Sequence, residues 1–161
     1  MPILTVIYAT GSGHTEYVVQ VLEKFLAKKS PRFKLHIVRA EEASLKDFTA
    51  SDFLILASGT WNTGGVEGQM HPNMYELLKG RAKDLDLKGQ SASVIALGDK
   101  RYFYTARAGE HLRSYIVNHG GDVSCTPLTI VNEPYGQEER VEKWGEKLLA
   151  TLRNAELRMQ N

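Results

Sequence analysis

The sequence predicts an α/β protein built on a doubly wound parallel sheet of five strands with helices on both faces. Short apolar, β-branched runs, which suit strands buried on both faces, alternate along the chain with segments of helical spacing. That alternation is typical of βαβ units and a parallel sheet. The 161 residues contain no repeat, linker or low-complexity tract, so we expect one domain over residues 1–161.

The first two strands frame a long helix. Residues Ile3–Ala9 are nearly continuous in apolar side chains and predict a buried strand. From His14 the apolar residues follow helical spacing, which a lysine pair and then Pro31 bring to an end. Residues Phe33–Val38 alternate in polarity, as a less buried edge strand does. The polar segment Ala40–Ser51 then serves as the second crossover.

The middle of the chain predicts two more strands with helices after them. Residues Asp52–Ser58 form another continuous apolar run and predict the third strand. The segment that follows, Ser58–Met70, is rich in glycine and is interpreted as a flexible loop, and a short helix begins after Pro72. Residues Ser91–Gly98 predict the fourth strand, and helical spacing resumes from Ala108.

The last predicted strand and helix complete the sheet. Residues Asp122–Val131 form the fifth strand, in which Pro127 indicates an edge position or an irregularity. Cys125 in this run is interpreted as a small buried residue, and Trp144 lies on the apolar face of the last helix. Both are therefore expected in the core.

Composition excludes several classes of function. Twenty basic and 19 acidic residues give a net charge of +1, so there is no basic excess for nucleic acid. No apolar run approaches the roughly 20 residues of a membrane span, no signal peptide is visible, and the histidines lack the spacing of metal ligands. With a single cysteine, these features lead us to expect a cytoplasmic protein without a metal.

The loop after the first strand has the composition of a phosphate site. A P-loop lysine is missing, and Glu16 stands where a dinucleotide fingerprint needs its third glycine, so both motifs fail. Hydroxyls and glycines remain at a helix N-terminus, which suits either a terminal monophosphate or simple helix capping. The residues of this first loop are Thr10, Gly11, Ser12, Gly13, His14 and Thr15.

The loops after the third and fourth strands supply aromatic and acidic groups. Trp61 lies in the glycine-rich segment, where a large ring is unfavourable unless something flat covers it. Asp99 follows the fourth strand, with Tyr102, Phe103 and Tyr104 close behind. Because ligands bind beyond the carboxyl ends of such strands, the three loops together predict a site for a flat, phosphorylated heteroaromatic.

These motifs resemble those of the flavodoxin family. Three patterns of that family occur here in the same order: the first loop, Thr60-Trp61 and the run from Gly98 to Tyr102. No added segment precedes the last helix, which resembles the family's short-chain type. The resemblance implies a strand order of 2-1-3-4-5. It also implies an electron carrier with no catalytic residue, cytoplasmic and monomeric, that serves redox partners such as an NAD(P)H-dependent flavodoxin reductase and an acceptor enzyme.

The resemblance further implies FMN as the cofactor. The first loop and Thr60 would hold the phosphate, Trp61 and Tyr102 would sandwich the ring, and Asp99 would accept from the ring's N3–H. The peptide after Asn62 would face the ring's N5, a position where the family often has glycine. The remaining residues assigned to the site are Thr63, Gly64, Gly98, Tyr104 and Ala106.

Two alternatives and one departure follow from the same residues. An FMN-dependent NAD(P)H or quinone reductase shares the fold, and so does a module that binds no flavin. A phosphoacceptor receiver is excluded because Ala9 and Ser58 stand where it needs acidic residues. Few carboxylates surround the predicted ring, so the second reduction step should be less negative than in acidic flavodoxins, because fewer charges oppose the reduced anion.

Overall fold

A parallel sheet forms the centre of the molecule. The computed structural model describes residues 1–29, 32–99 and 106–159, with side chains up to residue 154. The strands lie in the order β2 (Lys34–Arg39), β1 (Ile3–Ala9), β3 (Phe53–Thr63), β5 (Ser91–Gly98), with β6 (Asp122–Val123) and β7 (Leu128–Val131) along the far edge. These pairs are all parallel. The predicted order 2-1-3-4-5 is confirmed, with β6 and β7 sharing the fifth position.

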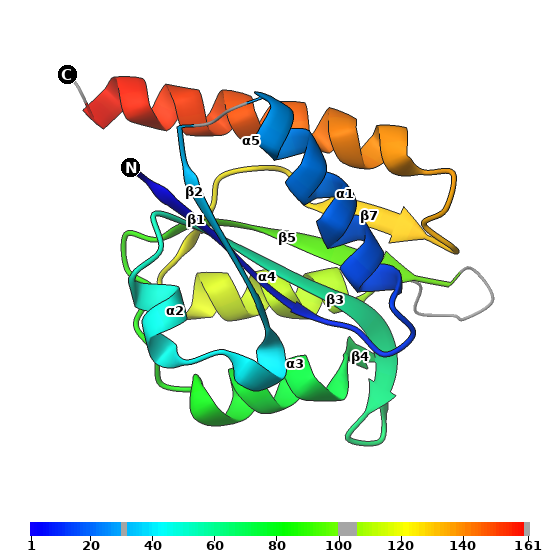
Figure 1. Cartoon of the computed structure of the whole chain (residues 1–161). Coiled ribbons are helices and arrows are strands. Elements are labelled where there is room, and N and C mark those ends of the chain that lie inside the picture. Colours follow the sequence, from blue (N-terminus) through cyan, green and yellow to red (C-terminus); the bar gives the residue numbers. More distant parts are fainter. Residues whose placement is uncertain (30–31, 100–105, 160–161) are drawn as a thin grey trace.

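Helices cover both faces of this sheet (Figure 1). The first and last helices lie side by side on one face, and the middle helices cover the other. Their bounds are α1 (His14–Lys29) and α5 (Glu138–Met159) on the first face, and η1 (Ala40–Glu42), α2 (Leu45–Thr49), α3 (Pro72–Glu76), the π-helical turn η2 (Leu77–Arg81) and α4 (Ala108–Asn118) on the second.

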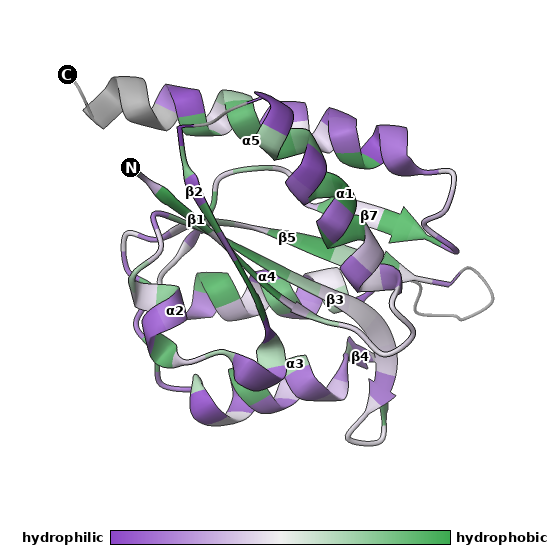
Figure 2. Ribbon diagram, in the orientation of Figure 1, coloured by the Kyte–Doolittle hydropathy of each residue, from purple (hydrophilic) through white to green (hydrophobic). Residues whose placement is uncertain are grey.

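Each face of the sheet has its own apolar core. Under α1 and α5, Leu22 and Leu148 are fully buried and Trp144, as predicted, is nearly so. Under α2 to α4 the largest fully buried side chain is Phe48, which belongs to the same apolar cluster as Met74. Figure 2 shows apolar strands between helices whose outer surfaces are hydrophilic. Burial from both sides is what the continuous apolar runs predict.

The segment after the third strand differs from its prediction. We expected a flexible loop, and this is wrong, because β3 continues to Thr63 and pairs antiparallel with β4 (Val66–Met70). Gly64 and Gly65 form the turn with φ of 65° and 77°, which is the left-handed conformation that two-residue hairpin turns require. The glycines that suggested flexibility therefore specify a hairpin.

The fifth strand is interrupted around Pro127, as its sequence indicates. It consists of β6 and β7, and Cys125 is buried between them rather than inside a strand. Two side chains bond the carbonyls left outside the ladder: Ser93 Oγ donates to Cys125 (2.8 Å) and Trp144 Nε1 donates to Thr126 (2.6 Å). The break thus leaves neither of these carbonyls without a partner.

The two helices on the first face approach closely. A Cβ on Gly145 of α5 would lie 2.6 Å from Phe25 Cδ1 of α1, so only glycine fits there without displacing the ring. Tyr17, at the start of α1, donates a 2.6 Å hydrogen bond to Glu138 at the start of α5. Segments about 120 positions apart in the chain are therefore joined along this face. In the described ranges, no helix is both long and apolar enough to span a membrane.

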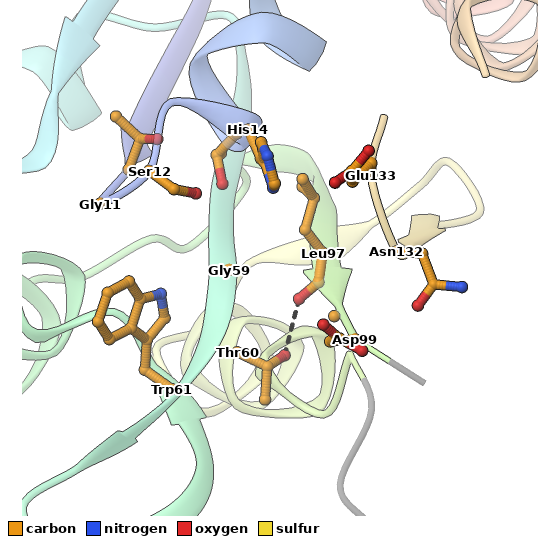
Figure 3. A pocket seen from close by; sticks show the side chains of 13 residues that line it. Gly11, Ser12, His14, Gly59, Thr60, Trp61, Leu97, Asp99, Asn132 and Glu133 are labelled. Atoms are coloured by element: carbon orange, nitrogen blue, oxygen red, sulfur yellow. Dashed lines mark hydrogen bonds between the residues drawn. The ribbon is translucent and has the colours of Figure 1, made fainter. Parts of the chain in front are cut away.

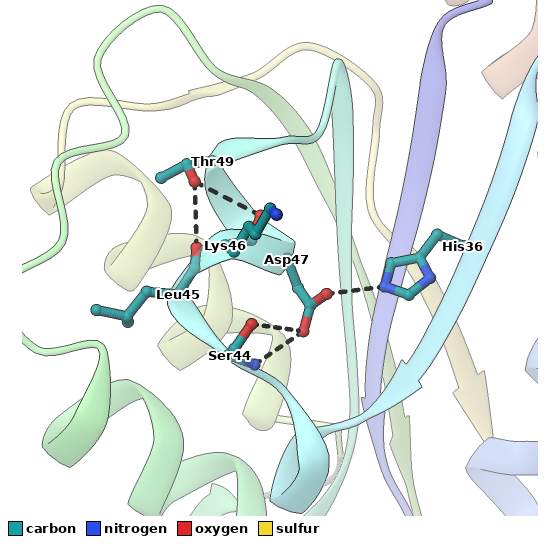
Figure 4. A network of polar contacts seen from close by, with 6 residues as sticks. All are labelled: His36, Ser44, Leu45, Lys46, Asp47 and Thr49. Carbon is teal, nitrogen blue, oxygen red and sulfur yellow. Dashed lines mark hydrogen bonds and ion pairs between the residues drawn. The ribbon is translucent and has the colours of Figure 1, made fainter.

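A polar network stabilises the crossover after β2 (Figure 4). The Asp47 carboxylate accepts the backbone N–H of Ser44 at 2.8 Å and pairs with His36 Nε2 at 2.9 Å. This is a capping box for α2 with an added link to β2. Burial acts to raise the pKa of Asp47, but the hydrogen bonds from Ser44 and His36 outweigh it and hold that pKa below its usual value.

Asp47→Asn is expected to lower the free energy of unfolding by about 1 kcal/mol at pH 7, the usual worth of a helix cap. Because the pKa of Asp47 is lowered on folding, its stabilisation is complete above the unfolded value of about 3.9 and is lost as pH falls through the folded value. Urea unfolding at pH 7 and pH 3 should show the difference shrinking in acid. Asp84→Asn, on an exposed aspartate, is the control. A constant difference at both pH values would contradict this assignment.

Candidate functional site

A cavity of about 850 Å³ opens at the carboxyl ends of β1, β3 and β5 (Figure 3). This is the edge where a sheet of this topology binds ligands, and the volume is in the range of small-molecule sites. Three loops and the segment after β7 contribute to it. The lining residues are Thr10, Gly11, Ser12, His14, Thr15, Gly59, Thr60, Trp61, Leu97, Gly98, Asp99, Asn132 and Glu133.

The first loop leads directly into α1. Thr10 Oγ1 accepts the N–H of Gly13 at 3.0 Å, and the Gly13 carbonyl accepts the N–H of Tyr17 at 2.9 Å. Gly13 has a φ of 94°, which favours glycine. Thr10 therefore stabilises the turn, while the exposed Ser12 lies at the cavity wall. The positive end of the α1 dipole faces the cavity, as an anion site requires.

A carboxylate in the first turn of α1 is paired away from the cavity. Glu16 accepts hydrogen bonds from Tyr8 at 3.1 Å and from Arg39 at 2.5 Å. Burial, and next the hydrogen bond to Glu16, raise the pKa of the Tyr8 hydroxyl, so this hydroxyl remains a donor at neutral pH. Arg39 balances the charge of Glu16, which reduces the repulsion that an anion at the first loop would meet.

Trp61 stands at the rim of the cavity, with 43% of its surface exposed. Its indole covers the first loop: a Cβ on Gly11 would lie 2.4 Å from Trp61 Cζ2. A Cβ on Gly59 would lie 3.2 Å from the indole nitrogen. Glycine at both positions lets the ring lie close to the backbone of the first loop and of β3. Gly59 was not among the site residues predicted from the sequence.

Thr60 joins three elements beneath the cavity. Its hydroxyl donates to the Leu97 carbonyl of β5 at 2.9 Å, drawn dashed in Figure 3, and accepts the N–H of Ala108 at 3.1 Å. The proton of this hydroxyl is thus directed at β5 in this arrangement. The threonine fixes the relative positions of β3, β5 and the start of α4, and so of the loops that they carry.

Several residues that the sequence assigned to the site lie outside the cavity lining. Thr63 donates its hydroxyl proton to the Met70 carbonyl within the hairpin, Asn62 lies where the β3–β4 register shifts, and Gly64 is in the turn. Ala106 has a φ of 57°, an unusual conformation that often marks functional sites. Gly13 does not line the cavity, but its backbone bonds to Thr10 and Tyr17 hold the turn of the first loop. Tyr102 and Tyr104 lie outside the described residues.

Sequence reasoning missed the wall that follows β7. Asn132, with a φ of 68°, donates its N–H to the Gly98 carbonyl at 2.7 Å, which places Glu133 at the cavity. Tyr135 packs its ring against His14 at 5.6 Å and against Tyr17 at 4.8 Å. The rule that ligands lie beyond the carboxyl ends of strands applies to the fifth strand too and could have found this wall. Glu133 adds a carboxylate to the charges counted around the site.

Together, the doubly wound sheet, the helix N-terminus and the exposed tryptophan define a mononucleotide-binding α/β protein. In the described part of the chain, no group of three or more His, Cys, Asp or Glu residues could hold a metal ion. The flavodoxin family model matches residues 6–144. The chain belongs to the flavodoxin family, whose members are small electron-transfer proteins that bind FMN.

Individual relatives agree with this family. "Probable flavodoxin 2" of Bacillus subtilis is 29% identical over 137 residues, which are 84% of this chain and 86% of that protein. A short-chain flavodoxin associated with a bacterial microcompartment is 25% identical, with a TM-score of 0.79 over 94% of this chain and 99% of that one. Oxidised flavodoxin 1 of Bacillus cereus, at 19% identity, shares the fold with a TM-score of 0.80 over 92% of this chain and 97% of that one.

Proposed function

We propose that FMN binds in this cavity with its phosphate on the first loop and its ring against Trp61. The observation that carries the proposal is an exposed indole directly beside a helix N-terminus. A flat ring next to the indole and a phosphate at the N–H groups of α1 would satisfy both features at once. Gly98 and Asp99 lie at the opposite wall, where they would contact the polar edge of the ring.

The residues present fit FMN better than a larger nucleotide. Ser12 and Thr15 offer hydroxyl groups at the first loop, and the helix supplies N–H groups, but no lysine of this loop faces a polyphosphate. Gly11 and Gly59 let the Trp61 indole pack directly on the backbone at both positions. The donor set therefore suits one terminal phosphate joined to a planar group.

We infer that the chain carries electrons singly between partner proteins, such as an NAD(P)H-dependent flavodoxin reductase and an acceptor enzyme, and works as a monomer. FMN supplies the redox chemistry when bound, so the protein needs only to bind it, orient it and set its potential. Asp99 and Glu133 act on that potential because negative charge at the wall disfavours a reduced, anionic ring. Lys100 and Arg101, which follow Asp99 in the chain, lie outside the described residues.

Anaerobic reductive titration of the FMN-loaded protein tests this function. Visible absorbance should follow two separate one-electron steps, and the protein should not oxidise NAD(P)H with a quinone unless a reductase is added. A single two-electron step with rapid unassisted turnover would instead favour the NAD(P)H or quinone reductase. A purified protein that takes up no FMN would contradict both the proposed binding site and the proposed electron transfer.

A further inference from the structure

A histidine that the cavity lining does not include lies directly behind Trp61. His71 joins β4 to α3, and its residue surface is only 7% exposed. Its backbone N–H donates to Ser58 Oγ at 2.9 Å, and the same hydroxyl donates to the Gly59 carbonyl at 2.8 Å. The backbone of His71 is therefore fixed to Ser58 of β3, three residues before Trp61 in the same strand.

The ring of His71 is held by a second bond, at Nδ1. This nitrogen accepts the N–H of Asn73 at 3.0 Å and so forms the N-cap of α3. An accepting nitrogen carries no proton, so the proton of the neutral ring is on Nε2. Nε2 is the atom directed toward the first loop: a Cβ on Gly11 would lie 3.4 Å from it.

Trp61 rests on this fixed ring. The two ring centroids are 4.9 Å apart with an interplanar angle of 75°, an edge-to-face contact. Both rings lie against Gly11, since the same Cβ would meet Trp61 and His71 together. An indole that is 43% exposed at a hairpin would otherwise have many orientations available.

We propose that His71 is a positioning residue for FMN binding. It holds the Trp61 indole over the first loop, so that the FMN ring binds against an indole that is already oriented. This inference rests on the proposed function and deepens it, because it assigns the orientation of the stacking residue to a side chain outside the cavity. Preorganisation of this kind raises the affinity for FMN, because the entropic cost of ordering the Trp61 indole is not incurred on binding.

The contact has a defined pH dependence. A second proton on the ring would sit on Nδ1 and face the N–H of Asn73, so it would break the cap. Burial lowers the pKa of His71, and Glu41 on η1 opposes this with a smaller effect. Gly11, Ser58, Trp61 and Asn73, which surround the ring from the first loop, β3 and α3, carry no charge. Because the pKa is lowered, the indole should be held at neutral pH and released only at a pH below the ordinary histidine value of about 6.5.

His71→Asn separates positioning from capping, because asparagine keeps an acceptor for the Asn73 N–H but removes the ring. In FMN-free protein, acrylamide quenching of Trp61 fluorescence should increase in His71→Asn and, for the unsubstituted chain, as pH falls below about 6.5. The FMN dissociation constant should rise about two- to tenfold, the range expected for one aromatic contact. His71→Ala should also lower the urea midpoint. His119→Asn removes a ring that packs on Tyr115, far from the cavity, and is the matched control.

A double-mutant cycle gives the decisive result. If His71 acts through Trp61, His71→Asn should have no further effect on FMN affinity in a Trp61→Ala background. An equal effect in both backgrounds, or unchanged quenching and affinity in His71→Asn alone, would overturn the inference. Failure of the proposed function would give a different result. Trp61→Ala would then leave FMN affinity unchanged, but quenching in the FMN-free His71→Asn protein would still show whether His71 holds the Trp61 indole.

Discussion

Replacing Ser12 with aspartate is expected to weaken FMN binding about a thousandfold. The new carboxylate would lie in the first loop, at the place proposed for the phosphate. At about 4 Å and an effective dielectric constant near 20, each like-charge pair costs on the order of 4 kcal/mol, which is about three powers of ten in the dissociation constant. The measurement is a fluorescence titration of FMN-free protein with FMN.

Riboflavin provides the control for this substitution because it has the same ring without the phosphate. Ser12→Asp should leave riboflavin affinity nearly unchanged, and Ser12→Ala should affect FMN only modestly. Thermal stability should not fall, since a negative charge ahead of α1 interacts favourably with the helix dipole. Equal losses for riboflavin and FMN would place the phosphate elsewhere.

Trp61→Ala is expected to weaken FMN binding about ten- to hundredfold. Stacking of a nucleic-acid base on an aromatic side chain is worth about 1–3 kcal/mol, and the FMN ring offers a larger surface. The loss should apply to riboflavin as well as FMN, which is the reverse of the Ser12→Asp pattern. Because 43% of the Trp61 surface is exposed, the urea midpoint should fall less than it would for a buried core tryptophan.

Val66→Ala is the matched control for Trp61→Ala. Val66 is on the same hairpin and is 53% exposed, but it does not line the cavity. Its substitution should leave both ligands bound as before. Unchanged FMN affinity in Trp61→Ala would contradict the stacking role, and a loss for FMN alone would assign Trp61 to the phosphate end.

The parallel sheet could be predicted from sequence because each buried strand leaves a continuous apolar run. Ile3–Ala9 and Ser91–Gly98 match β1 and β5 at both ends. The β3–β4 hairpin could not be found this way, because its residues form no continuous apolar run. Its only signal was the Gly64-Gly65 pair, which also suits a flexible loop.

The candidate site could be predicted from sequence where the residue types suited a ligand and the strand order placed those residues at one edge of the sheet. Ser12, Trp61 and Asp99 come from three loops whose place at one edge is set by the parallel strands, and the structure brings all three to one cavity. Glu133 was missed because an acidic residue before a helix is ordinary. The role that we propose for His71 depends on a ring contact across the β4–α3 junction, which spacing along the chain does not encode.

The pairing of α1 with α5 has a consequence for protein synthesis. A ribosome makes the first loop before the other parts of the site, whereas Glu133 at the far wall and the α5 residues that cover α1 emerge only after all the strands described. Until then the apolar side of α1 has no partner on that face, and a nascent chain must keep it from aggregating. The apolar face under α1 is covered only after α5 docks, so FMN is expected to load once α5 has emerged from the ribosome. A stalled chain that ends before residue 138 should therefore not retain the cofactor.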